Sequence, residues 1–414
     1  MPAKLANIPE LPTDEAFAVT SEFKLDDHFQ KVSLGAGVYR DEHSQPWILP
    51  SVKAAKSALH DTPALDHEYL PIQGFDAFLD VARELILGPQ DVPETAVVSI
   101  QTISGTGANH LGAAFLAQQL KPRHVFIPDP TWSNHHLVWA VAAPNVAQRP
   151  YPYYDPTRHS LDFDVMMSTL DTDAAEDDVV ILHACAHNPT GVDPSTEQWQ
   201  SLAQLFKRKK LFAFFDSAYQ GFATGDVDAD AWAVRHFQET LFDAPIASSK
   251  PQGMCIAQSF AKNFGLYGER VGAFHLVVPS DTGASGARSQ LLRLVRAEIS
   301  NAPLFGCRIV YTILSDPRLR AMWEQDLRTM SGRIKRMRTL LRREIEKNPN
   351  AGDWGHLESQ IGMFSYTGLT EEQVLRLKHE HHVYLMLNGR ASLSGVNEGN
   401  VKYVADAIIE VMSK

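Results

Sequence analysis

Residues 179–217 read VVILHACAHNPTGVDPSTEQWQSLAQLFKRKKLFAFFDS, and this stretch decides the fold. Its two ends, Val179–Cys185 and Leu211–Asp216, are almost wholly apolar and predict two strands that are buried on both faces. Between them, Asp193–Lys210 predicts a helix, with Asp193 as the N-cap and Pro194 as the first helical residue. A strand, a helix and a second strand in this order are typical of a parallel β-sheet covered by helices.

The same alternation continues on both sides of this unit, from about residue 95 to about residue 280. Short β-branched or aromatic runs are separated by helical stretches such as Gly107–Leu120. The predicted fold class is therefore α/β, with a mainly parallel sheet flanked by helices. The further predicted strands are Ala96–Ile103, His124–Pro128, Cys255–Phe260 and Phe274–Val278.

The character of the sequence changes after about residue 284. We expect two domains: a large one over residues 48–325, and a smaller α+β domain formed by residues 326–414 together with an N-terminal arm, residues 1–47. The boundary falls inside a long helical region, so the link between the domains is expected to be stiff. The predicted C-terminal elements are the helices Arg288–Ser300, Arg308–Leu314 and Leu319–Lys347, the strand Met363–Tyr366 and the helix Asn400–Met412.

Composition and charge exclude several classes of protein. The 414 residues include 38 Lys and Arg against 49 Asp and Glu, and the net charge of −11 opposes binding to nucleic acid or to an anionic membrane surface. No run of about 18 apolar residues predicts a transmembrane helix. Cys185, Cys255 and Cys307 are far apart in the sequence, so neither a disulfide framework nor a metal site is expected. The N-terminus has no signal or transit pattern, which predicts a cytoplasmic protein.

Ligands of open α/β sheets bind outside the carboxyl ends of the strands, so the residues that follow each strand are the candidates for chemistry. Ser104-Gly105-Thr106-Gly107 follows the first strand and opens a helix, where backbone N–H groups can hold an anion. Taken alone, such a glycine-rich stretch more often only makes a turn. Asp216 also ends a strand, although a helix N-cap is its ordinary alternative, and His187–Gly191 by itself reads as an Asn-Pro turn.

Lys262 lies just beyond the predicted strand Cys255–Phe260, in a stretch that also holds Ser259 and Arg270. A lysine at the end of a buried strand is costly unless it is paired or neutralised, and partial burial lowers the pKa of its ammonium group toward nucleophilic use. Most lysines lie on the surface. Here the hydroxyl, the guanidinium and the anion-binding loop accompany the lysine, so we single out Lys262 as the candidate reactive residue.

Taken together, these stretches resemble the class I pyridoxal-phosphate-dependent aminotransferases. The similarity extends along nearly the whole chain, from Val32–Arg40 through His67–Pro71 to Asn388–Arg390. It implies a fold-type-I large domain with a mainly parallel seven-stranded sheet. The motifs are S-G-T-G from Ser104, P-T-W ending at Trp132, H-N-P-T-G from His187, D-x-A-Y from Asp216 and S-F-x-K-N-x-G-x-x-x-x-R from Ser259.

The resemblance implies pyridoxal 5′-phosphate as the cofactor and assigns residues to its ring. Lys262 would hold the cofactor aldehyde as a Schiff base and then act as general acid and base. Asp216 would keep the pyridine nitrogen protonated, and Trp132 would stack on the ring. Tyr219 and Asn188 would hydrogen-bond the phenolic oxygen. The resemblance further implies that His135 orients Asp216; His183 is a weaker candidate for this task, with an ordinary core histidine as its alternative.

The cofactor phosphate and the partner subunit are implied in the same way. The phosphate would be bound by Ser104, Gly105, Thr106, Ser259 and the bidentate fork of Arg270. Tyr69 resembles the family tyrosine that reaches the phosphate from the neighbouring subunit. The resemblance therefore implies a homodimer with shared active sites.

Two arginines are implied in substrate binding. Arg390 would clamp the α-carboxylate, in a site that also includes Gly37, Trp132 and Asn188. Arg296 would take the distal carboxylate across the dimer, although a helix-surface arginine is its alternative, because Arg293 lies three residues earlier. The usual Ser-Asn-Pro-Pro reads Ser300-Asn301-Ala302-Pro303 here, and Ser133 replaces a common Gly or Thr. Neither change removes a catalytic group, but both leave side activity on aromatic substrates open.

The implied reaction is the reversible transfer of an amino group between L-aspartate and 2-oxoglutarate, giving oxaloacetate and L-glutamate by a ping-pong route. An aromatic or kynurenine-type aminotransferase is the alternative on the same scaffold, and a non-catalytic dimeric scaffold is the alternative from another class. Small dicarboxylic acids are compatible with the net charge of −11. Arg270, Arg296 and Arg390 would build a local cationic pocket inside an acidic protein.

Overall fold

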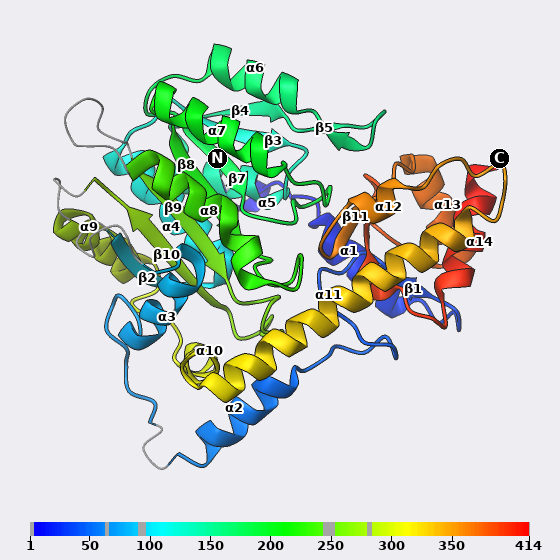
Figure 1. The fold of residues 1–414 in the computed structure, drawn as a ribbon, viewed down its shortest axis with the longest axis horizontal. Helices are drawn as coiled ribbons and strands as arrows, with labels where there is room; N and C mark the ends of the chain where they lie inside the picture. The colour runs from blue at the N-terminus through cyan, green and yellow to red at the C-terminus, as the bar shows by residue number, and fades with distance from the viewer. Residues whose placement is uncertain (1–3, 63–65, 90–96, 243–252, 280–283, 414) are drawn as a thin grey trace.

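The computed structural model describes residues 4–62, 66–89, 97–242, 253–279 and 284–413. Figure 1 shows two parts of the molecule, a sheet covered by helices and a smaller C-terminal part, with the long helix α11 (Pro317–Ile345) running from one to the other. We call them the sheet part and the C-terminal part. None of the helices in the described ranges combines the length and the apolarity that a membrane crossing requires.

The sheet part is built on seven strands in the order β2-β10-β9-β8-β7-β3-β4. All neighbours are parallel except β10, which is antiparallel to both β2 and β9. The predicted α/β class with a mainly parallel sheet is thus confirmed. The strands are β2 (Val97–Ile103), β3 (His124–Asp129), β4 (Ala147–Pro152), β7 (Val179–His183), β8 (Phe212–Ser217), β9 (Met254–Ser259) and β10 (Val271–Val277).

Both faces of this sheet are buried, as the continuous apolar strands predict. In β8, Phe212 and Phe214 belong to the apolar cluster on one face, and Ala213 and Phe215 to the cluster on the other, because successive side chains of a strand point to opposite faces. The first face is covered by α4 (Ser104–Gln119), α5 (Asn134–Ala142) and α9 (Ala284–Glu298), and the second by α6 (Phe163–Asp173), α7 (Thr196–Lys209) and α8 (Val227–Phe242).

The predicted start of the helix after β7 is wrong. Helix α7 begins at Thr196, and its N-cap is Ser195, whose Oγ accepts the Gln198 N–H at 3.3 Å while the Gln198 side chain accepts the Ser195 N–H at 2.8 Å. This reciprocal pair is a capping box. The Asp193 carboxylate instead accepts the backbone N–H groups of Ala186 and His187, at 2.6 and 2.9 Å. Asp193 therefore fixes the preceding turn and does not cap the helix.

Other boundaries also differ from the sequence-based ranges. Strand β10 begins at Val271, three residues before the predicted start, and β7 ends at His183, two residues before the predicted end. Strand β4 is not among the predicted strands. It contains Pro150 and Pro152 and lies at the edge of the sheet, where proline is tolerated. Of the predicted strand Ala96–Ile103, Ala96 lies outside the described residues.

The C-terminal part combines two short sheets with helices. Strand β11 (Phe364–Tyr366) pairs antiparallel with β13 (Arg390–Ser392), and β12 (Val383–Tyr384) pairs in parallel with β1 (Val32–Ser33). A segment near the N-terminus thus joins the C-terminal part. The exact division into residues 48–325 and 1–47 with 326–414 stays a prediction. The remaining elements of this part are α12 (His356–Ser359), α13 (Glu371–His381), the 3₁₀ turn η3 (Leu393–Gly395) and α14 (Val401–Met412).

Helix α11 links the two parts through packing. It contacts α2 (Pro50–His60) and α10 (Phe305–Ser315) near the sheet and α12 and α14 in the C-terminal part. Asp326 of α11 is buried and accepts the Ser51 backbone N–H and hydroxyl. The Trp323 indole donates to the Asn263 carbonyl oxygen at 2.8 Å. Because α11 is one continuous helix anchored at both ends, the predicted stiff link between the two parts has a physical basis.

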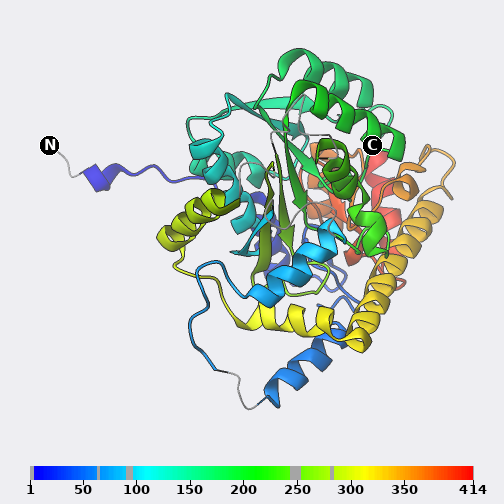
Figure 2. The same ribbon diagram turned by 60° about the vertical axis from the view of Figure 1, so that its left-hand side comes forward.

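The remaining elements lie near the N-terminus and at the edge of the sheet part. Helix α3 (Asp76–Leu87) packs on α8, and the short strands β5 (Tyr154–Asp155) and β6 (Ser160–Leu161) form a hairpin. Figure 2 shows the 3₁₀ helix η1 (Lys4–Asn7) standing away from the body of the molecule, ahead of α1 (Glu15–Leu25). Leu5 is 82 % exposed and Leu11 81 % exposed, so this arm presents apolar side chains to solvent.

Candidate active site

A pocket lies at the edge of the sheet where β7, β8 and β9 end, with a volume of about 570 Å³ including its open mouth. Ten of its lining residues are ones that the sequence analysis singled out for cofactor binding, and they come from segments up to 166 residues apart. Of the other four, only His183 was considered for a role from the sequence. The lining residues are Ser104, Gly105, Thr106, Trp132, His183, Cys185, Asn188, Asp216, Ala218, Tyr219, Ser259, Ala261, Lys262 and Arg270.

Lys262 lies three residues beyond the end of β9 and is nearly buried. Burial lowers the pKa of its ammonium group, and the nearby charges of Arg270 and Arg390 act in the same direction against the opposing effect of Asp216. Its Nζ lies 5.2 Å from the centroid of the Tyr219 ring. A lysine held in this way is neutral more often than a surface lysine, which is what a nucleophile or a proton carrier requires.

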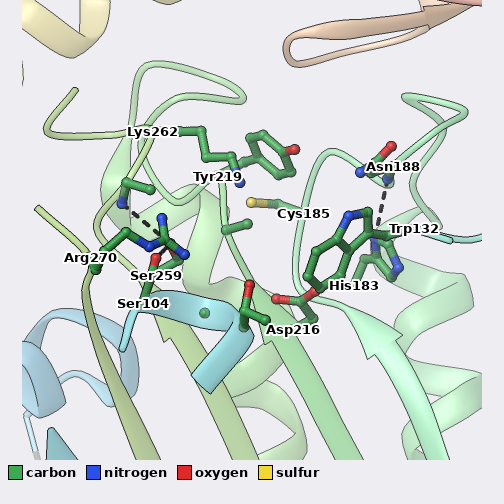
Figure 3. A pocket seen from close by; sticks show the side chains of 14 residues that line it. Ser104, Trp132, His183, Cys185, Asn188, Asp216, Tyr219, Ser259, Lys262 and Arg270 are labelled. Carbon is green, nitrogen blue, oxygen red and sulfur yellow. Dashed lines mark hydrogen bonds between the residues drawn. The ribbon is translucent and has the colours of Figure 1, made fainter. Parts of the chain in front are cut away.

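Asp216 projects from β8 on the other side of the pocket (Figure 3). It is only 9 % exposed, and its Oδ2 lies 3.0 Å from Nε2 of the buried His135. Burial acts to raise the pKa of this carboxyl, but the hydrogen bond and charge of His135 and the charge of Lys262 outweigh it, so the pKa is lowered. Asp216 therefore stays ionised inside the pocket wall.

A chain of hydrogen bonds connects Asp216 with the turn that carries Asn188. Thr131 Oγ1 lies 2.8 Å from His135 Nδ1 and 3.3 Å from His183 Nε2, and the Asn188 N–H donates to His183 Nδ1 at 3.1 Å. Burial, with the neighbouring His187 and His135, holds the pKa of His183 well below its usual value, so this ring is neutral. A neutral His183 that accepts the Asn188 N–H at Nδ1 donates from Nε2 to Thr131 Oγ1, so this part of the chain donates in the direction of Asp216.

Thr131 was not assigned a role from the sequence, although it stands in the P-T-W motif beside Trp132. Its hydroxyl is the link between the two histidines. Trp132 itself is half-buried, and its ring meets the His135 ring edge to face at 5.2 Å. The weaker candidate of the sequence analysis, His183, thus lies in the pocket wall and in the same hydrogen-bond chain as His135.

An anion-binding corner faces the Lys262 side of the pocket. Ser104, at the start of α4, and Ser259, at the end of β9, place their hydroxyl oxygens 3.1 Å apart, and Figure 3 shows the Arg270 guanidinium beside them. A Cβ added to Gly105 would lie 3.0 Å from the Ser259 Cβ, so a larger residue would crowd this corner. Hydroxyls, a guanidinium and the N-terminus of a 16-residue helix together suit a phosphate group.

Arg390 lies beside this pocket, in β13 of the C-terminal part, and is 8 % exposed. Its Nη1 donates to Asn188 Oδ1 at 3.3 Å and its Nη2 to the Gly35 carbonyl oxygen at 3.0 Å. Its Nε is buried and has no hydrogen-bond partner among the residues described. A buried guanidinium with one unpaired N–H group and only neutral acceptors is suited to bind a carboxylate.

Phe364 lies against the Arg390 guanidinium, whose central carbon is 4.3 Å from the ring centroid. Gly37 lies on another side of this ring, since a Cβ added there would be 3.5 Å from Phe364 Cζ. Phe364 was not singled out from the sequence. It is separated from Arg390 by 26 residues and reaches it only because β11 pairs with β13, and no local motif signals that pairing.

Tyr69 and Arg296 lie outside the pocket of their own chain. Tyr69 is 83 % exposed, and Arg296 is exposed on α9, where it donates to the Ser300 hydroxyl. The two segments are joined, because Asn301 Nδ2 donates to the Leu70 carbonyl oxygen at 3.0 Å. Both residues therefore belong to adjoining surface segments.

Known proteins match this chain along nearly its whole length. The family model "Aminotransferase class I and II" matches residues 30–408. The L-tyrosine:2-oxoglutarate aminotransferase of Aspergillus ustus is 45 % identical over 99 % of this chain and 78 % of its own. The cytoplasmic aspartate aminotransferase of Saccharomyces cerevisiae is 43 % identical over 98 % of this chain and 96 % of its own.

Solved structures of aminotransferases are also similar to this chain. A structure of aspartate aminotransferase from Saccharomyces cerevisiae cytoplasm has a TM-score of 0.94 at 42 % identity, covering 99 % of this chain and 98 % of that one. The aromatic-amino-acid aminotransferase of Burkholderia pseudomallei, covalently bound to pyridoxal phosphate, has a TM-score of 0.91 at 36 % identity, with 99 % of both chains covered.

Proposed function

The chain belongs to the aminotransferase class I and II family, and from that premise we propose that it is an aspartate aminotransferase that uses pyridoxal 5′-phosphate. The observation that carries the proposal is the pocket in which Lys262, with a lowered pKa, shares a cavity with the ionised Asp216 and an anion-binding corner. Two relatives, at 43 % and 42 % identity over nearly the full length, are named aspartate aminotransferases.

The residues present fit this cofactor. The corner formed by Ser104, Ser259 and Arg270 suits a phosphate, and Gly105 leaves room beside it. Asp216 is buried and ionised, so it can hold a proton on a ring nitrogen. When bound, pyridoxal phosphate supplies an aldehyde that takes up an amino group and a ring that accepts the electron pair released at the Cα of the amino acid.

Lys262 is proposed as the residue that binds the aldehyde carbon and then moves the proton at the substrate Cα. Burial lowers the pKa of its ammonium group, which favours the unprotonated amine that both tasks require. Asp216 is held by the hydrogen-bond chain through His135, Thr131 and His183, which fixes its orientation. Trp132, Tyr219 and Asn188 are proposed to hold the ring in place from the remaining walls of the pocket.

Arg390 is proposed to bind the α-carboxylate of the substrate. Its Nε is buried without a partner among the described residues, and Asn188 and Phe364 hold its guanidinium plane. A carboxylate that met this fork would pair with a charge that is otherwise surrounded by neutral groups. Gly37, beside Phe364, leaves space for the substrate at this end of the site.

A second copy of the chain is proposed to complete the site. Tyr69 and Arg296 lie on adjoining exposed segments of one subunit, and we propose that they enter the partner's pocket, Tyr69 toward the phosphate and Arg296 toward the distal carboxylate. We also propose that the chain divides into two domains, with bounds at residues 47 and 325. A cytoplasmic location, like that named for the yeast relative, is a further proposal.

Transamination of aromatic amino acids is the second candidate, because a relative at 45 % identity is named for L-tyrosine. The two candidates differ in the distal group of the substrate. A second carboxylate requires Arg296, since a buried carboxylate without a cation is costly. An aromatic ring does not require it, so removal of this arginine separates the two functions.

The test replaces Arg296 by leucine and measures kcat/KM for aspartate and for tyrosine, each with 2-oxoglutarate as acceptor. Loss of one member of a desolvated ion pair costs about 2–5 kcal/mol. We therefore expect kcat/KM for aspartate to fall about 30- to 5,000-fold and that for tyrosine to change less than about threefold. The matched control is Arg293→Leu, an exposed arginine one turn earlier on the same helix, which should leave both substrates unaffected.

Two results would count against the proposal. If the wild-type protein transfers the amino group of tyrosine but not that of aspartate, the second candidate replaces it. If Arg296→Leu and Arg293→Leu affect aspartate equally, Arg296 is an ordinary surface residue and the distal carboxylate is bound elsewhere.

A further inference from the structure

The turn that carries Asn188 is also a place where the C-terminal part touches the sheet part. Ile361, between α12 and β11, donates its backbone N–H to the Gly191 carbonyl oxygen at 2.7 Å. A Cβ added to Gly191 would lie 2.8 Å from the Phe364 carbonyl oxygen. Figure 1 shows α12 and β11 on the side of the C-terminal part that faces the sheet. The two parts therefore meet backbone to backbone beside the proposed substrate site.

Gly362 and Ala186 form the tightest point of this contact. Gly362 has a φ of 77°, and a Cβ added to it would lie 2.5 Å from the Ala186 Cβ, closer than two carbon atoms can pack. Ala186 cannot easily withdraw, because its own φ is 49° and its N–H is bonded to Asp193. The contact has no room for one more methyl group.

Each side of the contact is held rigidly. On the C-terminal side, the buried Arg338 of α11 donates to the carbonyl oxygens of Leu357, Gly362 and Phe364, so this segment is attached to the long helix. On the sheet side, Asp193 accepts two N–H groups of the turn, and the His187 ring stacks on Tyr153 with centroids 3.8 Å apart. A change at the contact therefore shifts the segment that carries Gly362 relative to the turn that carries Ala186, because neither side can adjust locally.

The two segments that meet at this contact each place a residue against Arg390. Asn188, two residues after Ala186, accepts the Arg390 Nη1–H, while Phe364, two residues after Gly362, lies against the guanidinium. Arg390 itself is paired with Tyr366 across β11 and β13. The position of Gly362 relative to Ala186 thus determines the position of Asn188 relative to Phe364.

We propose that the Gly362–Ala186 contact sets the geometry of the carboxylate site, and that Gly362 is a positioning residue that acts through Asn188, Phe364 and Arg390. This inference rests on the function proposed above. Lys262, Asp216 and Asn188 all belong to the sheet part, so their positions relative to one another do not depend on the contact, whereas Phe364 and Arg390 belong to the C-terminal part. A change at Gly362 therefore affects binding of the substrate carboxylate and leaves the cofactor in place.

The test is Gly362→Ala, with Gly352→Ala as the matched control. Gly352 has the same φ of 77° but nothing within 4 Å of an added Cβ, so it carries the backbone strain of the substitution without the contact. For Gly362→Ala we expect KM for aspartate to rise about tenfold, kcat to change less than about threefold, and cofactor affinity and the visible spectrum to stay unchanged. For Gly352→Ala all four quantities should match those of the wild type.

A methyl exchange separates the contact from local strain. The double variant Ala186→Gly/Gly362→Ala moves the methyl group from one side of the contact to the other, and glycine is well suited to the positive φ at position 186. We expect its KM for aspartate to return to within about threefold of the wild-type value. If Gly362→Ala alone does not fold, the double variant must fold and show this near-normal KM.

The inference is overturned if Gly362→Ala leaves KM unchanged, or if the double variant is no better than the single one. Measuring the dissociation constant of succinate, a dicarboxylate with no amino group to transfer, keeps this test separate from the proposed function. A wild-type protein that does not turn over aspartate would refute that function. The Gly362→Ala effect on succinate binding and its reversal in the double variant would still decide the inference.

Discussion

At the scale of single residues, the charged states of Lys262 and Asp216 are set by burial and by neighbouring groups. Burial lowers the pKa of the lysine, and His135 keeps the buried aspartate ionised. The same burial makes His183 neutral, which fixes the direction of donation from Asn188 through His183 to Thr131. Three groups with perturbed pKa values in one cavity are typical of a catalytic site.

Replacement of Lys262 by alanine tests this arrangement directly. Without the amine, no group covalently attaches the aldehyde and none is placed to move the Cα proton, so we expect kcat to fall at least about a thousandfold. The visible absorption band of the lysine-linked cofactor should be lost, while Arg270 and the two serines still retain the phosphate. Steady-state kinetics and an absorption spectrum measure both effects.

The control for that variant is Lys402→Ala, which removes an exposed lysine paired with Asp406 on α14. Its spectrum and turnover should equal those of the wild type. A Lys262→Ala protein that kept both the band and the turnover would show that a different amine performs these steps.

At the scale of elements, the strand ends were predictable from sequence and the contacts between distant elements were not. Asp216 and Lys262 could be assigned to strand ends because an apolar run followed by polar residues indicates a strand and its carboxyl end within one short stretch of sequence. Phe364 could not, because its contact with Arg390 depends on the pairing of β11 with β13. Asp193 was misplaced because Asp-Pro reads as a helix start, whereas its carboxylate is used by the left-handed turn at Ala186.

The start of α7 gives an element-scale prediction. Ser195→Ala removes the hydroxyl that accepts the Gln198 N–H, and loss of a serine N-cap costs about 1 kcal/mol of stability. We expect a lower midpoint in urea unfolding. Ser201→Ala, in the interior of the same helix, is the matched control and should be neutral or slightly stabilising, because alanine is the better helix former there. Equal effects of the two changes would argue against the capping box.

At the scale of the whole molecule, a single subunit holds an incomplete set of the proposed groups. Lys262, Asp216 and Arg390 are gathered in and beside one pocket, whereas Tyr69 and Arg296 face outward on adjoining segments. This separation distinguishes the residues proposed to act within their own chain from those proposed to act in the partner. It also means that a variant with a defect in one set can complement a variant with a defect in the other.

That complementation can be measured with a purified heterodimer of Lys262→Ala and Arg296→Leu subunits. One of its two sites contains an intact Lys262 together with an intact Arg296 from the other subunit, so we expect about half of the wild-type activity toward aspartate. Each variant homodimer has no intact site. A heterodimer as inactive as the two homodimers would show that both residues act within one chain.

The reversed direction of β10 has a consequence for the proposed cofactor site. Because β10 runs antiparallel to β9, the chain leaves the sheet at Ser259, passes Lys262 and re-enters at Val271 on the same edge, with Arg270 just before it. Lys262 and Arg270, the arginine proposed to bind the phosphate, are therefore joined by one short hairpin, and the span between them is fixed within the sheet part. Arg390, by contrast, comes from the C-terminal part. Any displacement of the C-terminal part would accordingly move Arg390 while the spacing between Lys262 and Arg270 stayed the same.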